Sequence, residues 1–359
     1  MRARLADIAA QAGVSEATVS RVLNGRPGVA EHTRQAVLTA LDVLGFERPA
    51  RLRRRGTGLV GLIVPELDNP VFPAIAQSVE RALAQYGHTP VLCTQIPGGF
   101  SEDDYTEMLM ERGVSGIVFV SGLHSDSTAD TGRYTRLLDR GLPMVFVNGC
   151  AEGLQATFVS SDEAGAAQLS VHHLADLGHR RIGLAVGPLR YVPTARKAAG
   201  FRAAMAERFG PASDVARAAA LPEGGLLEQS LFTVEGGQAA AGPLLDRGAT
   251  ALICANDLMA LGAIRTVRQR GLRVPEDVSV VGYDDSPLIG FTDPPLTTVR
   301  QPVHAMGQAA VRALQDAIAG DRPPRTELLF APELVVRAST APAPAPVPTT
   351  APAPESWVG

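Results

Sequence analysis

Long apolar segments and a secretion signal are both lacking in this sequence. The longest apolar runs, near residues 58–65 and 116–120, have the length of a strand and are too short to span a membrane. At the N-terminus the first arginines lead into an amphipathic pattern and not into the continuous apolar run of a signal peptide. We therefore expect a cytoplasmic protein that does not enter a membrane.

Cysteine is scarce as well, and lysine and tryptophan occur once each, as Lys197 and Trp357. Cys93, Cys150 and Cys254 are an odd number, are widely separated and lie in apolar strand patterns, which predicts buried free thiols. The sequence has no close Cys/His spacing that would indicate a metal site. We expect neither a metal nor a cofactor.

Residues 5–24 have the pattern of two helices joined by a glycine turn. Apolar side chains of the first helix recur at i, i+3, i+4 and i+7, as Leu5, Ile8, Ala9 and Ala12. Gly13 is suited to the positive φ of a sharp turn, and Ser15 can cap the second helix. In that helix Val19, Val22 and Leu23 point inward, which leaves small and polar side chains outside. Together with a third amphipathic segment, about residues 31–44, these helices predict a headpiece suited to the DNA major groove.

The alternative is a generic small helical bundle with a solvated polar face. The charge distribution favours DNA binding, because residues 1–55 contain ten Arg against five Asp and Glu, whereas the whole chain has a net charge of −4. Residues 56–359 therefore carry −9. A basic headpiece on an acidic body indicates that only one end of the protein binds phosphate. An arginine cluster, RLRRR at residues 51–55, ends the basic region.

Beyond residue 57, apolar runs of strand length alternate with segments of helix length. The runs are GLVGLIVP, TPVLCTQ, GIVFVSG, PMVFVNG, RIGLAVG, ALICAND and VSVVGYDD. This rhythm is typical of parallel α/β sheets covered on both faces, and about seven strands fit two doubly wound lobes better than one sheet. A chain of 359 residues is too long for one core, so two or three domains are expected.

The motif DIAxxAGVSxxTVSRVLN, from Asp7 to Asn24, closely resembles the headpiece of the lactose-repressor/galactose-repressor family of bacterial transcription regulators. Further stretches are similar to this family in the same order, as far as about Arg337. They are GLVGLIVPELDNPVF (58–72), LADLGHRRIGLAVG (174–187), CANDLMALGA (254–263), VPEDVSVVGYDD (274–285) and PPLTTVRQP (294–302). Within the family, the stretches GFERPARLRRRGTGLVGL, SGLHSDSTAD and EGGQAAAGPLLDR resemble the maltose-utilisation repressors.

The resemblance implies an α/β protein with a helix-turn-helix headpiece joined to a two-lobed, periplasmic-binding-protein-like body of doubly wound parallel sheets. It also implies that the chain crosses between the lobes three times, which we place near residues 160, 291 and 322. We expect the headpiece at 1–48, a hinge at 49–57, an N-terminal lobe at 58–159 plus 292–321 and a C-terminal lobe at 160–291 plus 322–338. The Ala/Pro-rich residues 339–359 have almost no apolar pattern and are predicted to be disordered.

Phosphate contacts position a DNA-binding protein and base-edge contacts specify the sequence. Members of the family reach base edges from the first turn of the second helix, which here holds Glu16 and Ala17. Glu can accept from a cytosine amino group, and Ala can meet a thymine methyl. Arg21, one turn further, is the candidate for a guanine or a phosphate. The short polar side chains suit phosphate oxygens, although Thr18 and Ser20 could equally be ordinary surface residues. These candidates are Ser15, Thr18, Ser20 and Asn24.

The resemblance further implies a hinge that folds into a short helix on DNA and wedges a leucine into the minor groove. Leu52, between Arg51 and Arg53, occupies that position. This linker is shorter than the usual family pattern and lacks its Pro-Asn pair, and the alternative is a flexible basic linker with an incidental leucine. Arg4 and Ala30 stand where the family usually has Thr or Ser helix caps, and a lost cap costs roughly 1 kcal/mol.

A cleft between two α/β lobes, at the carboxyl ends of strands, is the expected ligand site. Carboxylates, amides and an aromatic side chain follow the predicted strands, which suits a sugar with its hydroxyls and apolar C–H face. The family's effector contacts map onto Asn69, Phe72, Asn148, Asn256, Asp257, Asp284 and Gln301. Lys197 stands where many members carry an arginine, and it can donate only as a point charge. Asp257 could instead cap a helix that begins at Leu258, and Asp284 with Asp285 could form a turn.

The function predicted from these features is sugar-controlled repression of transcription. A homodimer, or a higher oligomer of dimers, reads a pseudo-palindromic operator in double-stranded DNA and is released by a small sugar such as maltose or a maltodextrin. A metabolite that acts as a corepressor is the alternative.

Two other classes of protein share features with this sequence. A sugar-binding transport receptor has the same two-lobed body, but it carries a secretion signal and no headpiece. A glycoside hydrolase would need Asp257 and Asp284 as an acid/base pair. The sequence has no P-loop, nucleophile elbow or metal cluster, so we expect no enzyme.

Overall fold

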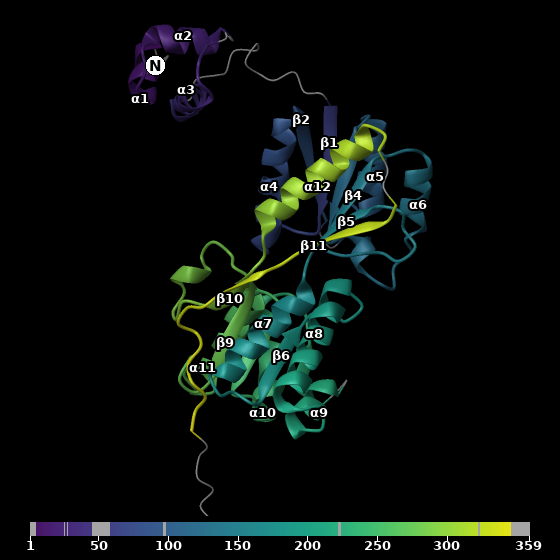
Figure 1. The fold of residues 1–359 in the computed structure, drawn as a ribbon, viewed down its shortest axis with the longest axis vertical. Coiled ribbons are helices and arrows are strands. Elements are labelled where there is room, and N and C mark those ends of the chain that lie inside the picture. The colour runs from purple at the N-terminus through teal and green to yellow at the C-terminus, as the bar shows by residue number, and fades with distance from the viewer. Residues whose placement is uncertain are drawn as a thin grey trace, which may run out of the picture. The chain divides into compact units, whose positions relative to one another are not determined.

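The computed structural model describes residues 5–24, 26, 28–44, 58–95, 98–221, 224–321 and 324–345. The headpiece, within residues 1–57, and the α/β body that begins at Gly58 are separate compact units (Figure 1). The predicted hinge residues Arg51, Leu52 and Arg53 lie outside the described residues, as does Trp357.

The headpiece consists of three helices around one small core. They are α1 (Leu5–Ala12), α2 (Glu16–Leu23) and α3 (Glu31–Val43). Their buried side chains are the apolar positions of the sequence pattern: Ile8, Ala9, Val19, Val22, Leu23, Val37, Ala40 and Leu41. Gly13 joins the first two helices at a φ of 64°, and no heavy atom lies within 4 Å of the position that a Cβ would take. The turn therefore needs glycine for its backbone conformation and not for space.

The N-terminal lobe of the body is built on a six-stranded sheet of order β11-β5-β4-β3-β1-β2. Its strands are β1 (Gly58–Val64), β2 (His88–Thr94), β3 (Gly116–Val120), β4 (Met144–Val147), β5 (Thr157–Ser161) and β11 (Thr326–Phe330). The strand pairs β1–β3, β3–β4, β4–β5 and β5–β11 are all parallel. Helices α4 (Val71–Gln85) and α12 (Val303–Ile318) pack on one face, and α5 (Glu102–Glu111) and α6 (Gly132–Asp139) pack on the other. Central strands buried on both faces explain the continuous apolar runs of the sequence.

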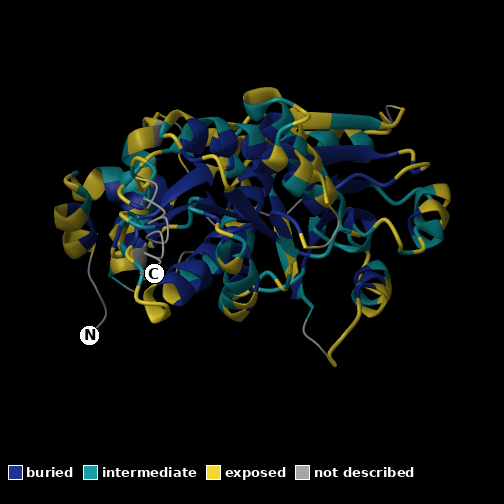
Figure 2. Ribbon diagram, turned by 90° about the horizontal axis from the view of Figure 1, so that it is seen from below, coloured by how far each residue is buried: buried dark blue, intermediate teal, exposed yellow. Residues whose placement is uncertain are grey.

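The C-terminal lobe repeats this architecture with a sheet of order β12-β10-β9-β8-β6-β7. Its strands are β6 (Ile182–Val186), β7 (Leu227–Gln229), β8 (Ala251–Cys254), β9 (Ser279–Asp284), β10 (Thr297–Arg300) and β12 (Glu333–Val335). Only β12 runs antiparallel among the pairs of this sheet that the structure describes. The helices pack in pairs, α7 (Glu163–Asp176) with α8 (Val192–Phe209) and α10 (Val234–Asp246) with α11 (Asp257–Gln269), and α9 (Asp214–Ala220) packs on α8. Figure 2 shows buried strands between helices whose outer faces are exposed.

The EGGQAAAGPLLDR stretch has a structural reason for its glycines. A Cβ on Gly237 of α10 would lie 2.0 Å from the carbonyl oxygen of Met259, and a Cβ on Gly262 of α11 would lie 1.9 Å from that of Val234. Because both obstacles are backbone atoms of the facing helix, neither could move aside. Glycine at these two positions lets α10 and α11 approach backbone to backbone.

Seven of the twelve strands in the described residues are the apolar runs that were predicted, namely β1, β2, β3, β4, β6, β8 and β9. The other five were not predicted because they are short or carry few apolar residues. Two of the three predicted crossings are wrong. β10 was expected in the N-terminal lobe, but it pairs with β9 in the C-terminal sheet, and β11 pairs with β5 in the N-terminal sheet. The chain therefore crosses near Asp162, after Arg300 and after Phe330.

The prediction that disorder begins at residue 339 is also wrong. Ser339 Oγ accepts from the backbone N–H of Thr297 at 2.8 Å and donates to the carbonyl oxygen of Val280 at 2.6 Å. Its own carbonyl accepts from the N–H of Val280 at 2.8 Å. The segment 339–343 thus supplies hydrogen-bond partners to the amino ends of β9 and β10, which pattern-based reasoning cannot detect in an Ala/Pro sequence. Residues 346–359 lie outside the described residues.

Two further predictions concern cysteine and the membrane. Cys93, Cys150 and Cys254 are all buried free thiols, which confirms that prediction. Among the helices that the structure describes, none is long and apolar enough to cross a membrane.

Candidate functional site

A cavity of about 210 Å³ lies between the two lobes of the body. It lies at the carboxyl ends of strands from both sheets, because parallel strands all end at the same edge and the two edges face each other. Seven of the eight predicted effector-site residues line it: Asn69, Phe72, Asn148, Lys197, Asn256, Asp284 and Gln301. The eighth, Asp257, does not. The predicted positions are therefore brought together in space, although they span more than 230 residues of sequence.

Three of the cavity residues have an uncommon backbone conformation. Ser121, Asn148 and Asp284 have φ values of 47°, 64° and 111°, and each stands at or just after the end of a strand. A positive φ is costly for residues other than glycine, and such residues gather at functional sites. The conformation turns the polar side chains together, since Nδ2 of Asn148 donates to Oγ of Ser121 at 2.6 Å. Backbone strain thus coincides with the cavity.

Asp284 is a buried carboxyl in the cavity wall. Gln301 Nε2 donates to Asp284 Oδ1 at 2.7 Å. Burial raises the pKa of Asp284 well above its usual value, and the nearby Asp257 adds to this, while the bond from Gln301 and the charge of Lys197 oppose it. Oε1 of Gln301 and Oδ1 of Asn148 are buried without a hydrogen-bond partner among the described residues. A ligand that donates hydrogen bonds to these two oxygens would therefore satisfy them.

Lys197 is held by a pair of side chains that sequence reasoning did not identify. Its Nζ lies 2.6 Å from Oε2 of Glu163 and 3.2 Å from the centroid of the Tyr283 ring. The Tyr283 hydroxyl donates to Oε1 of Glu163 at 2.8 Å and lies 3.0 Å from Oγ of Ser161. Lys197 and Glu163 are both almost completely buried. The only lysine of the chain is therefore neutralised by a partner and stacked on an aromatic ring.

Aromatic side chains form a further part of the wall. Phe72 comes from the N-terminal lobe, and Tyr191 and Phe232 come from the C-terminal lobe. The ring centroids of Tyr191 and Phe232 are 6.1 Å apart. Such faces suit the apolar C–H side of a sugar ring, while amides and carboxylates suit its hydroxyls.

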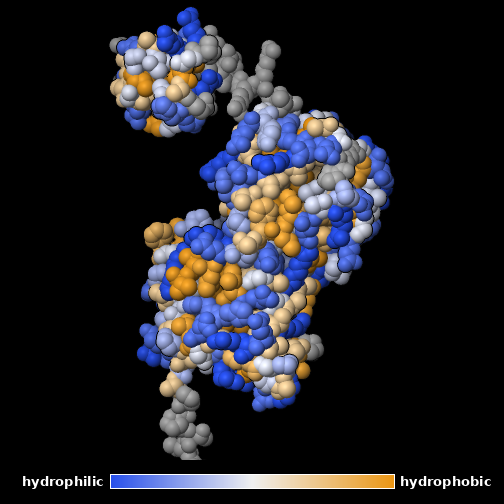
Figure 3. All heavy atoms as spheres, in the orientation of Figure 1, coloured by the Kyte–Doolittle hydropathy of each residue, from blue (hydrophilic) through white to orange (hydrophobic). Residues whose placement is uncertain are grey.

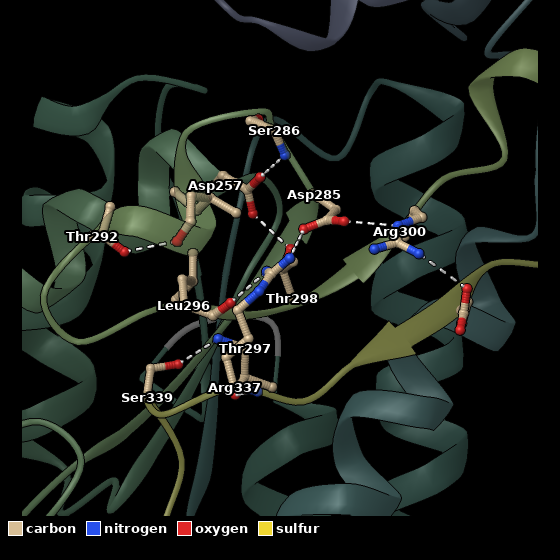
Figure 4. A network of polar contacts seen from close by, with 12 residues as sticks. Asp257, Asp285, Ser286, Thr292, Leu296, Thr297, Thr298, Arg300, Arg337 and Ser339 are labelled. Carbon is tan, nitrogen blue, oxygen red and sulfur yellow. Dashed lines mark hydrogen bonds and ion pairs between the residues drawn. The ribbon is translucent and has the colours of Figure 1, made fainter.

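Asp257 does not line the cavity, and its carboxylate takes part in a network of polar contacts (Figure 4). Its Oδ2 accepts from the backbone N–H of Ser286 at 2.7 Å, and its Oδ1 accepts from Oγ1 of Thr298 at 2.6 Å. The predicted capping role belongs to Asn256, whose Oδ1 accepts from the N–H of Met259 at 2.8 Å, so that α11 begins at Asp257 and not at Leu258. Asp257 thus ties the start of α11 to the loop after β9 and to β10.

Asp285 is likewise structural. It binds Nε of Arg300 at 2.7 Å through Oδ2 and Nη2 of Arg337 at 2.6 Å through Oδ1 (Figure 4). The two adjacent aspartates therefore have different roles. Asp285 binds Arg300 at the end of β10 and Arg337 after β12, and Asp284 lines the cavity.

The sequence held a usable signal for one of the residues that were missed. Ser121 follows β3 directly, so the strand-end rule that found Asn148 would also have found it. Glu163 follows β5 by two residues, but β5 was not predicted, so the rule could not be applied there. Tyr283 lies inside β9, and Tyr191 and Phe232 lie in loops. No local pattern distinguishes these three aromatic residues from core or surface residues.

The second candidate site is the outer face of α2 in the headpiece. Ser15 caps this helix, because its Oγ accepts from the N–H of Thr18 at 3.2 Å. Glu16, Ala17, Arg21 and Asn24 are exposed, whereas Thr18 and Ser20 are half-buried. Asn24 Nδ2 donates to Oγ of Ser20 at 3.2 Å. The predicted base-reading residues Glu16, Ala17 and Arg21 therefore lie on the accessible side of a capped helix.

Comparison with known protein families gives a match for each unit. The headpiece matches the family described as bacterial regulatory proteins, lacI family, over residues 4–48. Residues 171–340 match the periplasmic binding protein-like domain.

Two relatives from Streptomyces are similar along almost the whole chain. An uncharacterized HTH-type transcriptional regulator in the aml 5' region of Streptomyces limosus is 64% identical over 338 residues, which are 94% of each chain. The HTH-type transcriptional regulator MalR of Streptomyces coelicolor is 61% identical over 341 residues, which are 95% of this chain and 97% of MalR.

Solved structures give the same family and fold. A complex of the transcriptional regulator CelR with cellobiose has a TM-score of 0.67 and 34% identity, and the match covers 94% of this chain and 100% of that chain. The lac repressor dimer bound to operator and the anti-inducer ONPF has a TM-score of 0.66 and 27% identity, and the match covers 95% of this chain and 100% of that chain. With both units matched and relatives above 60% identity along nearly its whole length, the chain belongs to the LacI family of bacterial transcription regulators.

Proposed function

We propose that this regulator represses sugar-utilisation genes as a homodimer on a pseudo-palindromic operator, and that maltose or a maltodextrin in the inter-lobe cavity releases it. The observation that carries the proposal is the cavity itself. It combines unsatisfied acceptors at Asn148 and Gln301 with a carboxyl at Asp284 and aromatic walls. An unsatisfied buried polar group costs about 1–3 kcal/mol, so ligand hydroxyls that donate to these atoms would recover that free energy.

The charge of the cavity favours a neutral ligand. Lys197 is paired with Glu163, so it offers no free cation to a phosphate. The other carboxyl groups in the wall, Glu66 and Asp284, both have raised pKa values because they are buried, which favours their neutral forms. An anionic ligand would therefore find no unpaired cation among the described residues of the wall, whereas the hydroxyls of a neutral saccharide could donate to the unsatisfied acceptors. The resemblance to maltose-utilisation repressors, and the cellobiose in the CelR complex, support a glucose-based saccharide.

Recognition of DNA is assigned to the exposed face of α2. Glu16, Ala17 and Arg21 are exposed on this helix. We assign Glu16 and Ala17 to base edges, and Arg21 to a guanine or a phosphate. Ser15, Thr18, Ser20 and Asn24 are assigned to phosphate oxygens, as are Arg51 and Arg53, with Leu52 as a minor-groove wedge.

A homodimer would also cover apolar surface of the body. Leu288 and Phe291 of the C-terminal lobe are 77% and 87% exposed. Figure 3 shows apolar residues gathered in patches on the viewed face of each lobe. Large exposed apolar side chains usually mark an interaction surface. The lac repressor structure is a dimer on its operator, and two-fold protein symmetry would match a palindromic site.

The control mechanism follows from linkage between the two sites. To act as an inducer, the sugar must bind the conformation with low operator affinity more tightly than the other conformation. A coupling free energy of about 1–3 kcal/mol corresponds to a loss of operator affinity of roughly 5- to 150-fold.

The test is a titration of purified full-length protein with sugars in the presence of operator DNA. Genomic fragments that the protein retains provide the operator, and fluorescence anisotropy measures its affinity at constant salt. Maltose and maltotriose are compared with cellobiose, which has the same composition as maltose and a different linkage. Release by the maltose series supports the proposal, tighter binding would assign a corepressor, and no response to any of them would refute the effector. Recovery of intact sugar after incubation excludes turnover.

A further inference from the structure

We propose that the segment Ser121–Asp130 is a latch that holds the two lobes closed over the cavity and slows the departure of the effector. This inference rests on the function proposed above for the cavity and assigns a regulatory role to the SGLHSDSTAD stretch. The segment follows β3 in the N-terminal lobe, and it contacts the loop Arg190–Tyr191 between β6 and α8 in the C-terminal lobe.

The contacts between the two segments form a short antiparallel bridge. Asp126 and Tyr191 are paired as in a sheet, and Ser127 N–H donates to the carbonyl oxygen of Arg190 at 2.9 Å. Oγ of Ser127 donates to the same carbonyl at 2.8 Å. Arg190 Nε lies 2.9 Å from Oδ2 of Asp126, which adds a charge-assisted hydrogen bond. Backbone and side chains thus join the lobes at one place.

The latch is rigidly attached to its own lobe. His124 is completely buried, contacts the carbonyl of Val147 at 3.1 Å and packs on the rings of Tyr134 and Phe146. The N–H of Leu123 donates to the buried carboxylate of Glu102 at 3.2 Å. Because these anchors are within the N-terminal lobe, the segment keeps its shape when the lobes separate. It can therefore re-form the bridge with a small entropic cost.

The latch segment also forms part of the cavity wall. Ser121 and Ser125 line the cavity from the latch segment, and Tyr191 lines it from the opposite lobe. Arg190 lies over the Tyr191 ring, 4.7 Å from its centroid, and its Nη2 donates to the Tyr191 hydroxyl at 2.9 Å. Closure of the bridge therefore also positions an aromatic wall against the ligand.

The position of the bridge distinguishes it from the crossing strands. In the N-terminal sheet β3 is separated from β11 by β4 and β5, and in the C-terminal sheet β6 is separated from β12 by β8, β9 and β10. The covalent crossings thus lie toward one side of both sheets and the bridge lies toward the other. A rotation about the crossings leaves those connections intact and must break the bridge.

The test compares two latch variants with a matched control. Asp126→Ala removes the carboxylate from one lobe, and Arg190→Met removes the guanidinium from the other. Asp246→Ala is the control, because it breaks an Asp–Arg pair with Arg270 that lies within the C-terminal lobe. Maltose affinity and dissociation rate are measured by calorimetry and stopped flow on the full-length protein, and thermal melting verifies the fold of each variant.

A second measurement needs no sugar. Spin labels on Glu111→Cys and Glu207→Cys, which are exposed residues on different lobes, report the inter-lobe distance, and the native cysteines are buried. In the latch variants we expect longer distances between the spin labels. In the maltose measurements we expect a Kd that is about three- to tenfold higher, because maltose dissociates faster. Unchanged distances in both variants would overturn the latch. A distance change in a protein that binds no maltose would retain the latch and refute the effector.

Discussion

Replacement of Lys197 by methionine should destabilise the body strongly. Lys197 and Glu163 form an ion pair that is almost entirely shielded from water, with only 6% and 4% of the side chains exposed. Methionine fills a similar volume but leaves the Glu163 carboxylate buried without its cation. Breaking a buried pair by removing one partner costs about 3–5 kcal/mol. For a lobe of this size that corresponds to a fall of roughly 10 °C in the thermal midpoint.

Two further variants separate the effect of charge from that of packing. In the double variant Lys197→Met with Glu163→Gln, no charge is left unpaired, and the amide oxygen can still accept from the Tyr283 hydroxyl. We therefore expect most of the lost stability to return. Arg208→Met is the matched surface control, because its pair with Asp176 is 45% and 69% exposed and such pairs contribute at most about 1 kcal/mol.

The assay is thermal unfolding followed by circular dichroism, without sugar or DNA. A Lys197→Met midpoint as close to the wild type as that of Arg208→Met would refute the reasoning, since the ion pair would then be no better shielded than a surface pair. A double variant that is less stable than Lys197→Met would also contradict it, because a charge-neutral site would then be worse than a buried lone carboxylate.

Asp284→Ala should abolish the response to maltose in the anisotropy assay and leave operator affinity without sugar nearly unchanged. If the variant lost both the maltose response and operator affinity, the protein would be misfolded and Asp284 would no longer be assigned to the effector site. Arg21→Ala should weaken operator binding and relax discrimination against random duplex, and equal losses on both DNAs would reduce Arg21 to a phosphate contact. Burial lowers the pKa of His124 to about 4, so the unfolded state takes up a proton near pH 6.5 before the folded state does, and stability should fall between pH 6.5 and about 4. His124→Phe should reduce that slope, and an unchanged slope would assign it to other groups. Truncation after Ala338 should lower the thermal midpoint, because it removes the bonds of Ser339 to β9 and β10, and an unaltered midpoint would show that the segment adds no stability.

Much of the fold could be predicted because its determinants are local. The period of the apolar residues in α1 and α2 specifies which helix face is buried, and Gly13 specifies where the turn lies. Six of the seven strands that were predicted are central in their sheets, so each of these six leaves a continuous apolar run, whereas β2 is an edge strand that is only partly buried. The short strands β7, β10 and β12 leave no such run, because their place in the sheet depends on partners far away in the sequence.

The effector site could be predicted in part for a related reason. Parallel strands bring their carboxyl ends to one edge, so polar residues directly after strands are gathered without knowledge of the contacts. That rule found Asn148 and Asp284, but it included Asp257, which does not line the cavity and whose carboxylate accepts from Ser286 and Thr298. It could not find Tyr283, because an aromatic residue inside a buried strand looks like any core residue.

The sequence by itself determined the headpiece, the α/β class of the body and most positions of the cavity wall, since these follow from periodicity, charge and strand ends. Only the tertiary structure decided that Lys197 is neutralised by Glu163, that the second and third crossings follow Arg300 and Phe330, and that Ser339 is bound to the sheet. The physical reason is common to all three. Ion pairs, strand partners and hydrogen bonds between distant segments depend on how the chain folds back on itself. A local pattern of residues does not show which distant segments come into contact.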